Sequence, residues 1–273
     1  MSSFLEISSE KLARLIGTPN CPELIDVRID DDFDTDPRLI PGSYRRDYRQ
    51  MQSWIDGVTK ASAIIICQQG KKLSHGVAAW LRNAGIAADV LDGGFEAWAS
   101  AGYPAVPVSA IPERDASGRS VWVTRARPKI DRIACPWLIR RFVDPKAVFL
   151  YVAPSEAEMV GERFGATPFD IDAPIRWSHR GELCTFDVMV EQFGLATTPL
   201  LRLATIVRGA DTARLELAPE APGLLAASLG LSRMYADDLE QLEAGMLLYD
   251  AFYRWCRDAT NETHNWPSPK KDL

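Results

Sequence analysis

The sequence predicts an α/β domain, a parallel sheet flanked by helices, followed by a mostly helical α+β domain. Over residues 1–104, short apolar runs alternate with helix-like segments, which is typical of a parallel sheet with helical crossovers. Residues 105–120 interrupt this alternation with proline, serine, glycine and charged residues, as a linker does. A length of 273 residues also favours two domains. We therefore expect a domain at 1–108, a linker at 109–120, a second domain at 121–260 and a flexible tail at 261–273.

The first half provides strands and helices in alternation. The apolar runs ELIDVR, SAIIIC and ADVLDGG predict buried strands. The segment SSEKLARLIG predicts a helix capped by Ser9. The segment HGVAAWLRNAG predicts a helix that Gly85 ends, and FEAWASAG predicts a shorter helix that Gly102 and Pro104 close.

The second half begins with two expected strands, VWVTR and AVFLYVA. Between them, ACPWLIRRFV predicts a helix with Pro136 in its first turn, where a missing N–H costs nothing. After them, SEAEMVGERFG predicts a helix that begins at the N-cap Ser155 and ends before Gly165.

The rest of the second half is expected to be helical. The segment TPLLRLATIVRG has Thr198 as its predicted cap, Pro199 in the first position and Gly209 as its stop. A last long helix follows, with one apolar face. The members of that face are Leu239, Leu242, Met246, Tyr249 and Tyr253.

The composition limits the classes of function. The net charge is −6, whereas proteins that coat nucleic acid are usually basic. No apolar run approaches the ~20 residues of a membrane span, and the N-terminal residues lack the pattern of a signal peptide. Five cysteines without a CxxC pair fit neither a disulfide framework nor a zinc finger. We expect a cytoplasmic protein that binds no membrane and does not coat nucleic acid.

Cys67 is the strongest candidate for a reactive residue, because it ends a strand just before a helix. The loop is Cys67-Gln68-Gln69-Gly70-Lys71-Lys72, and the helix is expected to start near Leu73 or Ser74. Backbone N–H groups of such a turn, the helix N-terminus and two lysines should together stabilise a thiolate or persulfide. The alternative is a buried cysteine that acts only as a small apolar residue.

Residues 1–104 resemble the rhodanese-like sulfurtransferases. The matching motifs are LIDVR at 24–28, IPGS at 40–43, CQQGKKLS at 67–74 and LDGGFEAW at 91–98. The resemblance implies that Cys67 carries a persulfide and that Gln68, Gln69, Gly70, Lys71 and Lys72 form the cradle around it. Its six-residue loop favours sulfur over phosphate substrates. Asp26 and Arg28 are expected to brace the strand ends.

The second half contains a basic segment and a segment rich in metal-ligand residue types. Seven cationic residues and one acid, Asp131, lie between Arg119 and Arg141. This pattern favours an oxyanion site, with a nucleic-acid contact or a solvated surface as alternatives. Further on, residues 170–190 contain six plausible metal-ligand types: Asp170, Asp172, His179, Glu182, Cys184 and Asp187. Of these we consider His179, Cys184 and Asp187 as metal ligands, the alternative being a hydrogen-bonded structural histidine.

Residues 121–258 resemble the C-terminal domain of chromate-resistance regulators of the ChrB type. The matching segments are WVTRARPKIDRIACPWLIRRFVDP, HRGELCTFD, IVRGADT and LAPEAPGLLAASLGLS. The resemblance implies a role in the response to chromate, and it makes Arg125, Arg132, Arg140 and Arg141 candidates for a chromate-binding or sulfate-binding surface.

Together these features predict a sulfurtransferase linked to chromate resistance. Cys67 is expected to take sulfur from thiosulfate or a similar donor and to pass it to a thiol, cyanide or a protein acceptor, with no cofactor required. One alternative is a redox-sensing or chromate-sensing regulatory protein without turnover. Another is a metal-dependent enzyme in the second domain.

Overall fold

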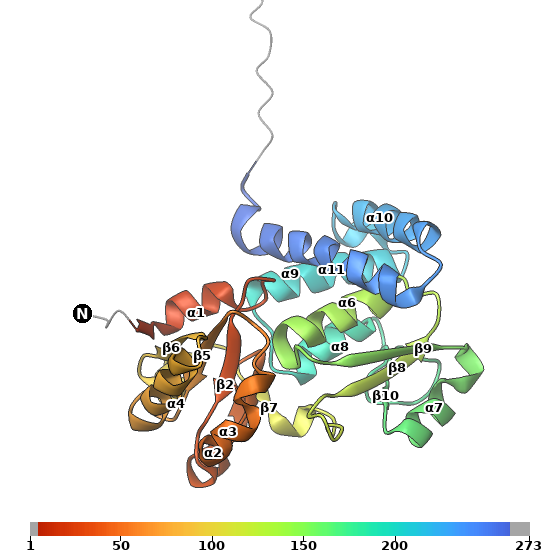
Figure 1. The fold of residues 1–273 in the computed structure, drawn as a ribbon. Coiled ribbons are helices and arrows are strands. Elements are labelled where there is room, and N and C mark those ends of the chain that lie inside the picture. The colour runs from red at the N-terminus through yellow and green to blue at the C-terminus, as the bar shows by residue number, and fades with distance from the viewer. Residues whose placement is uncertain (1–4, 263–273) are drawn as a thin grey trace, which may run out of the picture.

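The computed structural model describes residues 5–262 and confirms the predicted fold class (Figure 1). Its first half holds a five-stranded parallel sheet in the order β1-β6-β5-β2-β4. The strands are β1 (Glu6–Ile7), β2 (Glu23–Asp26), β4 (Ser43–Arg45), β5 (Ser62–Ile66) and β6 (Ala87–Leu91). The helices are α1 (Ser9–Leu15), α2 (Asp30–Thr35), α3 (Met51–Trp54), α4 (Lys72–Asn83) and α5 (Gly94–Ser100). A separate antiparallel pair joins β3 (Arg38–Leu39) to β7 (Val106–Pro107).

Both faces of this sheet are covered, which explains the continuous apolar runs. Ile25 of β2 belongs to a core cluster with Val77 and Leu81 of α4. Its neighbour Leu24 belongs to a different cluster, with Leu12 of α1. Because successive side chains of a strand point to opposite faces, a strand buried on both sides is apolar throughout. The parallel strands end at one edge of the sheet, so the residues after β2, β4 and β5 lie at that edge.

The predicted structural role of Asp26 and Arg28 is confirmed. Arg28 donates to Asp26 Oδ2 from Nε at 2.9 Å and from Nη2 at 2.7 Å, and both side chains are almost fully buried. The same guanidinium donates to the backbone carbonyls of Asp36 and Arg38. The pair thus fixes the chain that leaves β2 against the segment that leads to β3.

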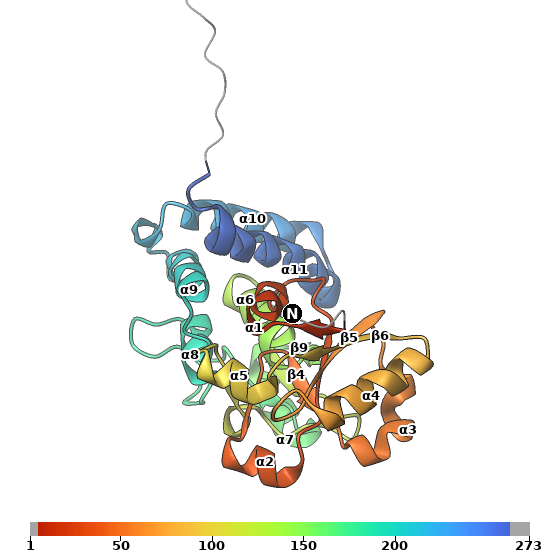
Figure 2. The same ribbon diagram turned by 90° about the vertical axis from the view of Figure 1, so that its left-hand side faces the viewer.

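The second half is mostly helical around a small parallel sheet in the order β10-β8-β9. The strands are β8 (Val121–Arg125), β9 (Val148–Val152) and β10 (Thr167–Pro168). The helices are α6 (Asp131–Leu138), α7 (Ala157–Phe164), α8 (Thr185–Gln192), α9 (Thr198–Asp211), α10 (Ala221–Met234) and α11 (Asp238–Arg254). Figure 2 shows α10 and α11 at the far end of the molecule from α2 and α3.

The predicted place of Pro136 in a first helical turn is wrong. Helix α6 begins at Asp131, so Pro136 lies inside it. A proline in a helix interior leaves the carbonyl four residues earlier without its usual N–H donor. That carbonyl belongs to Arg132, and it accepts a hydrogen bond from the Tyr151 hydroxyl at 2.9 Å. A side chain from β9 therefore makes the interior proline tolerable, which local sequence rules do not anticipate.

Two predicted N-caps are displaced by one residue. Ser8, rather than Ser9, caps α1 by accepting a hydrogen bond from the third N–H of the helix. Ser155 lies within a short 3₁₀ turn, so Glu156 occupies the N-cap position of α7. The predicted end of α7 is confirmed, because Gly165 adopts a left-handed φ of +62° just after it.

Three predictions for the last helices also need correction. Thr197 rather than Thr198 occupies the N-cap position of α9. Gly209 does not stop α9, because the helix continues to Asp211. A Cβ at Gly209 would lie 3.0 Å from the Cβ of Ala221, so this glycine permits close packing of α9 on α10. Leu239 is 49% exposed, whereas the other four members of the predicted apolar face are buried.

The two halves share one continuous core. A Cβ at Gly17, just after α1, would overlap the rings of Phe142 and Tyr253. The ammonium group of Lys146 lies 3.1 Å from Glu23 Oε1 across the junction. Buried apolar residues of both halves, from Leu12 to Cys256, belong to this single cluster.

The segment between the halves is ordered. Arg114 forms a β-bridge with Ser120, and Arg119 pairs with Asp115 at 2.8 Å. The boundaries of the domains at 108 and 121 stay a prediction. All but two residues of the predicted tail, 261–273, lie outside the described residues. Within residues 5–262, no helix is both long and apolar enough to span a bilayer.

Candidate functional site

Cys67 lies at the carboxyl edge of the parallel sheet, between β5 and α4. The Lys71 backbone N–H donates to its sulfur at 3.3 Å, and Ser74 Oγ lies 3.1 Å from the same sulfur. The Ser74 hydroxyl also donates to the Lys71 carbonyl at 2.9 Å. Helix α4 begins at Lys72, slightly earlier than expected. The sulfur therefore sits at a helix N-terminus, where N–H groups and the helix dipole favour negative charge.

Backbone contacts with the start of α5 hold the loop in this position. Phe95 N–H donates to the Cys67 carbonyl and Glu96 N–H donates to the Gln68 carbonyl, each at 3.0 Å. Gly70 has a left-handed φ of +65°, and an added Cβ there would lie 2.8 Å from the backbone nitrogens of Gly93 and Gly94. Only glycine combines this conformation with so close an approach. The loop and α5 thus form one rigid unit.

The other predicted cradle residues lie around the loop. Gln68 Nε2 donates to Glu96 Oε1 at 3.2 Å, while Gln68 Oε1 is buried without a hydrogen-bond partner among the described residues. Gln69, Lys71 and Lys72 are exposed. The lysine side chains can therefore reach an anion that approaches from solvent, and the buried contacts to the sulfur come from Ser74 and the backbone. Ser74 was not predicted to contact Cys67, although it lies within the CQQGKKLS motif.

The remaining cysteines are placed as ordinary core or half-buried thiols. Burial raises the pKa of Cys21 to about 11, against the opposing charges of Lys60 and Arg141. Burial also raises the pKa of Cys256 to about 11. Cys135 and Cys184 are fully buried, and all five cysteines are free thiols. A thiol held neutral by burial is a poor nucleophile.

The four candidate arginines of the second half are dispersed into separate ion pairs. Arg125 and Arg132 both contact Asp170 Oδ2, at 3.3 and 3.4 Å. Arg140 pairs with Glu243 at 2.5 Å and Arg141 with Asp250 at 2.8 Å, on the α11 side. The structure thus brings together Arg125 and Arg132 but not the whole set. An oxyanion-binding role for the four stays a prediction.

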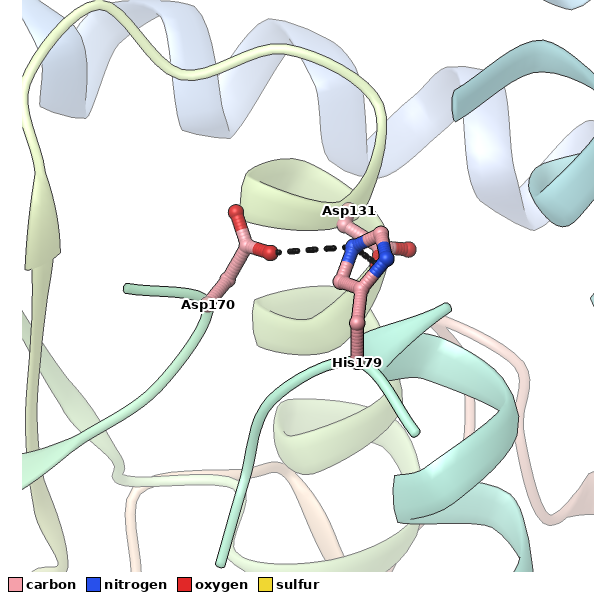
Figure 3. A group of neighbouring side chains, drawn as sticks. All are labelled: Asp131, Asp170 and His179. Atoms are coloured by element: carbon pink, nitrogen blue, oxygen red, sulfur yellow. Dashed lines mark ion pairs between the residues drawn. The ribbon is translucent and has the colours of Figure 1, made fainter. Parts of the chain in front are cut away.

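His179 lies among three carboxylates that come from separate parts of the second half, and Figure 3 draws it with two of them, Asp131 and Asp170. Its Nε2 is 3.4 Å from Asp170 Oδ1, 3.5 Å from Asp131 Oδ2 and 3.3 Å from Asp211 Oδ2. Contacts with Asp170 and Asp211 raise the pKa of His179 to about 10. Burial, together with Asp211 and Asp170, raises the pKa of Asp131 well above its ordinary value. We call Asp131, Asp170, His179 and Asp211 the His179 cluster.

The other two predicted ligands lie at the start of α8. The Cys184 backbone N–H donates to Asp187 Oδ2 at 3.1 Å, and Asp187 Oδ1 accepts from Arg208 Nη1 at 2.9 Å. Asp187 thereby caps the helix. Of the carboxylates that do meet His179, Asp170 lies in the segment that the sequence marks for its metal-ligand types, nine positions away. Asp131 and Asp211 were not predicted as partners of His179, because no short spacing links them to it.

Two protein families match this chain in succession. The rhodanese-like domain matches residues 8–101, and the family described as ChrB, C-terminal domain, matches residues 122–256. Among curated proteins, Protein ChrB of Cupriavidus metallidurans is 35% identical over 159 residues, which are 56% of this chain and 47% of that protein. The chain thus spans about half the length of this relative.

Solved structures of rhodanese-like proteins are similar to about a third of this chain. A rhodanese-like domain protein from Staphylococcus aureus is 23% identical, with a TM-score of 0.30, and the match covers 34% of this chain and 89% of that one. A rhodanese-related protein from Thermoplasma volcanium is 19% identical, with a TM-score of 0.32, and the match covers 38% of this chain and 98% of that one.

Proposed function

We propose that this chain, in which a rhodanese-like domain precedes a ChrB C-terminal domain, is a sulfurtransferase that carries sulfur as a persulfide on Cys67. One observation carries the proposal: the Cys67 sulfur lies at the N-terminus of α4, within 3.3 Å of the Lys71 N–H and 3.1 Å of Ser74 Oγ. Both groups can donate hydrogen bonds to a sulfur that bears negative charge.

In the first half-reaction, the Cys67 thiolate attacks the outer sulfur of thiosulfate. A new S–S bond forms as the S–S bond of thiosulfate breaks, and sulfite leaves with the bonding electron pair. The exposed ammonium groups of Lys71 and Lys72 lie on the loop where the dianion approaches, and their charge attracts it. The Ser74 hydroxyl accepts from a thiol and can rotate to donate to a thiolate or persulfide.

In the second half-reaction, a nucleophile attacks the terminal sulfur of the persulfide. Cyanide gives thiocyanate, and a thiolate gives a new persulfide. In either case the Cys67 thiolate leaves with the electron pair of the broken S–S bond, so the chain returns to its starting state. Sulfur transfer of this kind needs no cofactor, since the cysteine itself forms the covalent intermediate.

We further propose that this sulfur chemistry serves the response to chromate. The support is the match of residues 122–256 to the ChrB C-terminal domain. Arg125 and Arg132, which lie together beside Asp170, are the candidates for contact with an oxyanion. Retention of chromate by the purified chain, with sulfate as competitor, tests this part of the proposal.

Turnover of thiosulfate with cyanide tests the enzymatic proposal. The wild-type chain should form thiocyanate and sulfite in equal amounts. Cys67→Ser should abolish the reaction, because the covalent carrier is lost. Cys21→Ser is the matched control, since this half-buried thiol lies outside the loop, and it should retain the wild-type rate. A folded wild-type chain with no turnover, or equal turnover by Cys67→Ser, would contradict the proposal.

A further inference from the structure

The His179 cluster brings together four side chains from three segments of the second half. Asp131 opens α6, Asp211 ends α9, and Asp170 and His179 lie on the irregular chain between β10 and α8. One ligand atom from each of Asp131, Asp170 and His179 lies within 4.8 Å of the other two. Figure 3 shows these three side chains converging from a helix and two loops. None of this geometry serves sulfur transfer at Cys67.

The spacing within the cluster suits co-ligands of one ion better than hydrogen bonds. His179 Nε2 lies 3.3–3.5 Å from one oxygen of each of three carboxylates. An N–H···O hydrogen bond usually spans about 2.7–3.2 Å, and one N–H cannot point at three acceptors. Ligands held about 2.1 Å from a shared ion lie about 3.0–3.4 Å from their neighbours, in octahedral or tetrahedral geometry respectively. The observed separations of 3.3–3.5 Å are closer to this ligand-to-ligand spacing than to the usual length of a hydrogen bond.

Asp131 supplies an independent sign of a missing partner. Its side chain is 1% exposed, and its Oδ1 has no hydrogen-bond partner within the described part of the chain. A buried carboxylate without full pairing is costly, and proteins usually satisfy it with hydrogen bonds, an opposite charge or a metal. Asp170 and Asp211 contact the same imidazole ring, so one His179 side chain faces three carboxylates and cannot neutralise them all. A divalent cation would bind Asp131 and Asp170 directly and would balance the negative charge of Asp211 beside them.

Surrounding groups hold the carboxylates in place, as outer-shell partners do in metal sites. Thr185 donates from its backbone N–H to Asp131 Oδ2 at 2.6 Å and from Oγ1 to Asp170 Oδ1 at 3.0 Å. Arg125 and Arg132 hold the other oxygen of Asp170. Asp170 itself has a left-handed φ of +47°, a conformation that is uncommon outside glycine and often marks a functional site.

We propose that Asp131, Asp170 and His179 bind one divalent metal ion of the Mn²⁺ class, with Asp211 beside them as a partner of His179. Two carboxylate groups and one imidazole form a set of hard oxygen donors with a single nitrogen, which suits Mn²⁺ or Fe²⁺ better than a thiolate-seeking ion. His179 is 42% exposed, whereas Asp131 and Asp170 are buried. The ion therefore has a solvent side on which water or an oxyanion completes its coordination. The site is independent of the proposed sulfur transfer.

Titration of the full chain with Mn²⁺, after treatment with a chelator, tests this site. Calorimetry should show one ion per chain, and the electron paramagnetic resonance signal of free Mn²⁺ should fall in proportion. His179→Ala should weaken binding by at least about tenfold. His75→Ala is the matched control, because His75 is similarly exposed (45%) but contacts one carboxylate among residues 5–262, that of Glu6 at 3.4 Å. It should bind as the wild type does.

Asp131→Asn keeps the test decisive if other variants fold poorly. The substitution preserves shape and removes one of three crowded carboxylates, so the metal-free variant should melt no lower than the metal-free wild type. Added Mn²⁺ should raise the melting temperature of the wild type and leave that of Asp131→Asn unchanged. Absence of Mn²⁺ binding by a folded wild type would overturn the site, since His179 would then be only a charged partner of the carboxylates. Binding of Zn²⁺ without Mn²⁺ would overturn the choice of ion.

Discussion

Replacement of Gly70 by alanine should disable the Cys67 loop while the rest of the chain stays folded. Gly70 has a left-handed φ of +65°, and an added Cβ would lie 2.8 Å from the backbone nitrogens of Gly93 and Gly94. It would also collide with the Leu91 carbonyl oxygen. All three contacts are backbone atoms, which cannot rotate out of the way as a side chain can. Relief therefore requires the loop to separate from α5.

The cost of this substitution follows from the structure. A left-handed conformation costs a residue with a side chain about 1–2 kcal/mol. Separation of the loop from α5 breaks two backbone hydrogen bonds, donated by Phe95 and Glu96, each worth about 1 kcal/mol. The total is about 3–4 kcal/mol. If the loop remains displaced, turnover should fall by about a hundredfold or more, since each 1.36 kcal/mol is tenfold in rate.

Urea unfolding and the rate of thiocyanate formation measure the two effects together. Gly76→Ala is the matched control, because Gly76 lies on the exposed face of α4 and no described atom lies within 4 Å of its added Cβ. Alanine is about 1 kcal/mol more favourable than glycine inside a helix, so this variant should be more stable and equally active. Wild-type turnover by Gly70→Ala would refute the claim that the loop geometry matters for reaction at Cys67.

Three further predictions test other parts of the structure. Ser74→Ala removes a hydroxyl 3.1 Å from the reactive sulfur and should lower kcat/KM by about 10-fold to 100-fold, since a hydrogen bond to a charged group is worth about 1.5–3 kcal/mol; an unchanged rate would mean that the hydroxyl is only structural. Tyr151→Phe removes the hydroxyl that donates to the Arg132 carbonyl, whose usual helical donor is replaced by Pro136. The free energy of unfolding in urea should fall by about 1–3 kcal/mol, and no loss of stability would show that this carbonyl has another partner. Burial alone would raise the pKa of Glu23, but hydrogen bonds from its neighbours and the charge of Lys146 hold this pKa below its ordinary value of 4.5. The ionised Glu23 therefore stabilises the fold above pH 4.5, and this stabilisation is lost as the pH falls through the lowered pKa. Glu23→Gln should therefore be less stable than the wild type at pH 7, and the gap between their unfolding free energies should close below about pH 4.5; a gap that is constant with pH would contradict this account.

The arrangement around Cys67 could be predicted because its parts are contiguous. A buried strand, a short loop with Gly70 and a helix follow one another over residues 62–83, so local propensities place the sulfur at the helix N-terminus. The role of Ser74 was missed since its contact depends on the helix starting at Lys72, one residue earlier than expected. Residue patterns do not define the first residue of a helix to within one position.

The His179 cluster could not be predicted in the same way. Its carboxylates come from Asp131, Asp170 and Asp211, which only the packing of α6, α9 and the β10–α8 segment brings together. Asp187, which the sequence suggested as a ligand beside His179, instead caps α8. Within a sequence, a capping carboxylate and a ligand carboxylate look alike, and long-range packing decides between them.

The same limit applies to Pro136. Because proline is common in the first turn of a helix, Pro136 predicted a helix start nearby. The hydroxyl of Tyr151, which reaches the freed carbonyl from a neighbouring strand, allows the helix to begin at Asp131 instead. Tertiary hydrogen bonding thus overrides a strong local signal.

The intact mass of the chain, before and after incubation with thiosulfate, tests the central claim most directly. The wild type should gain the mass of one sulfur atom, and cyanide should remove it again. Cys67→Ser should gain nothing, while Cys21→Ser should gain one sulfur as the wild type does. A folded wild type that gains no sulfur, or a Cys67→Ser variant that gains as much, would contradict the assignment of Cys67 as the sulfur carrier.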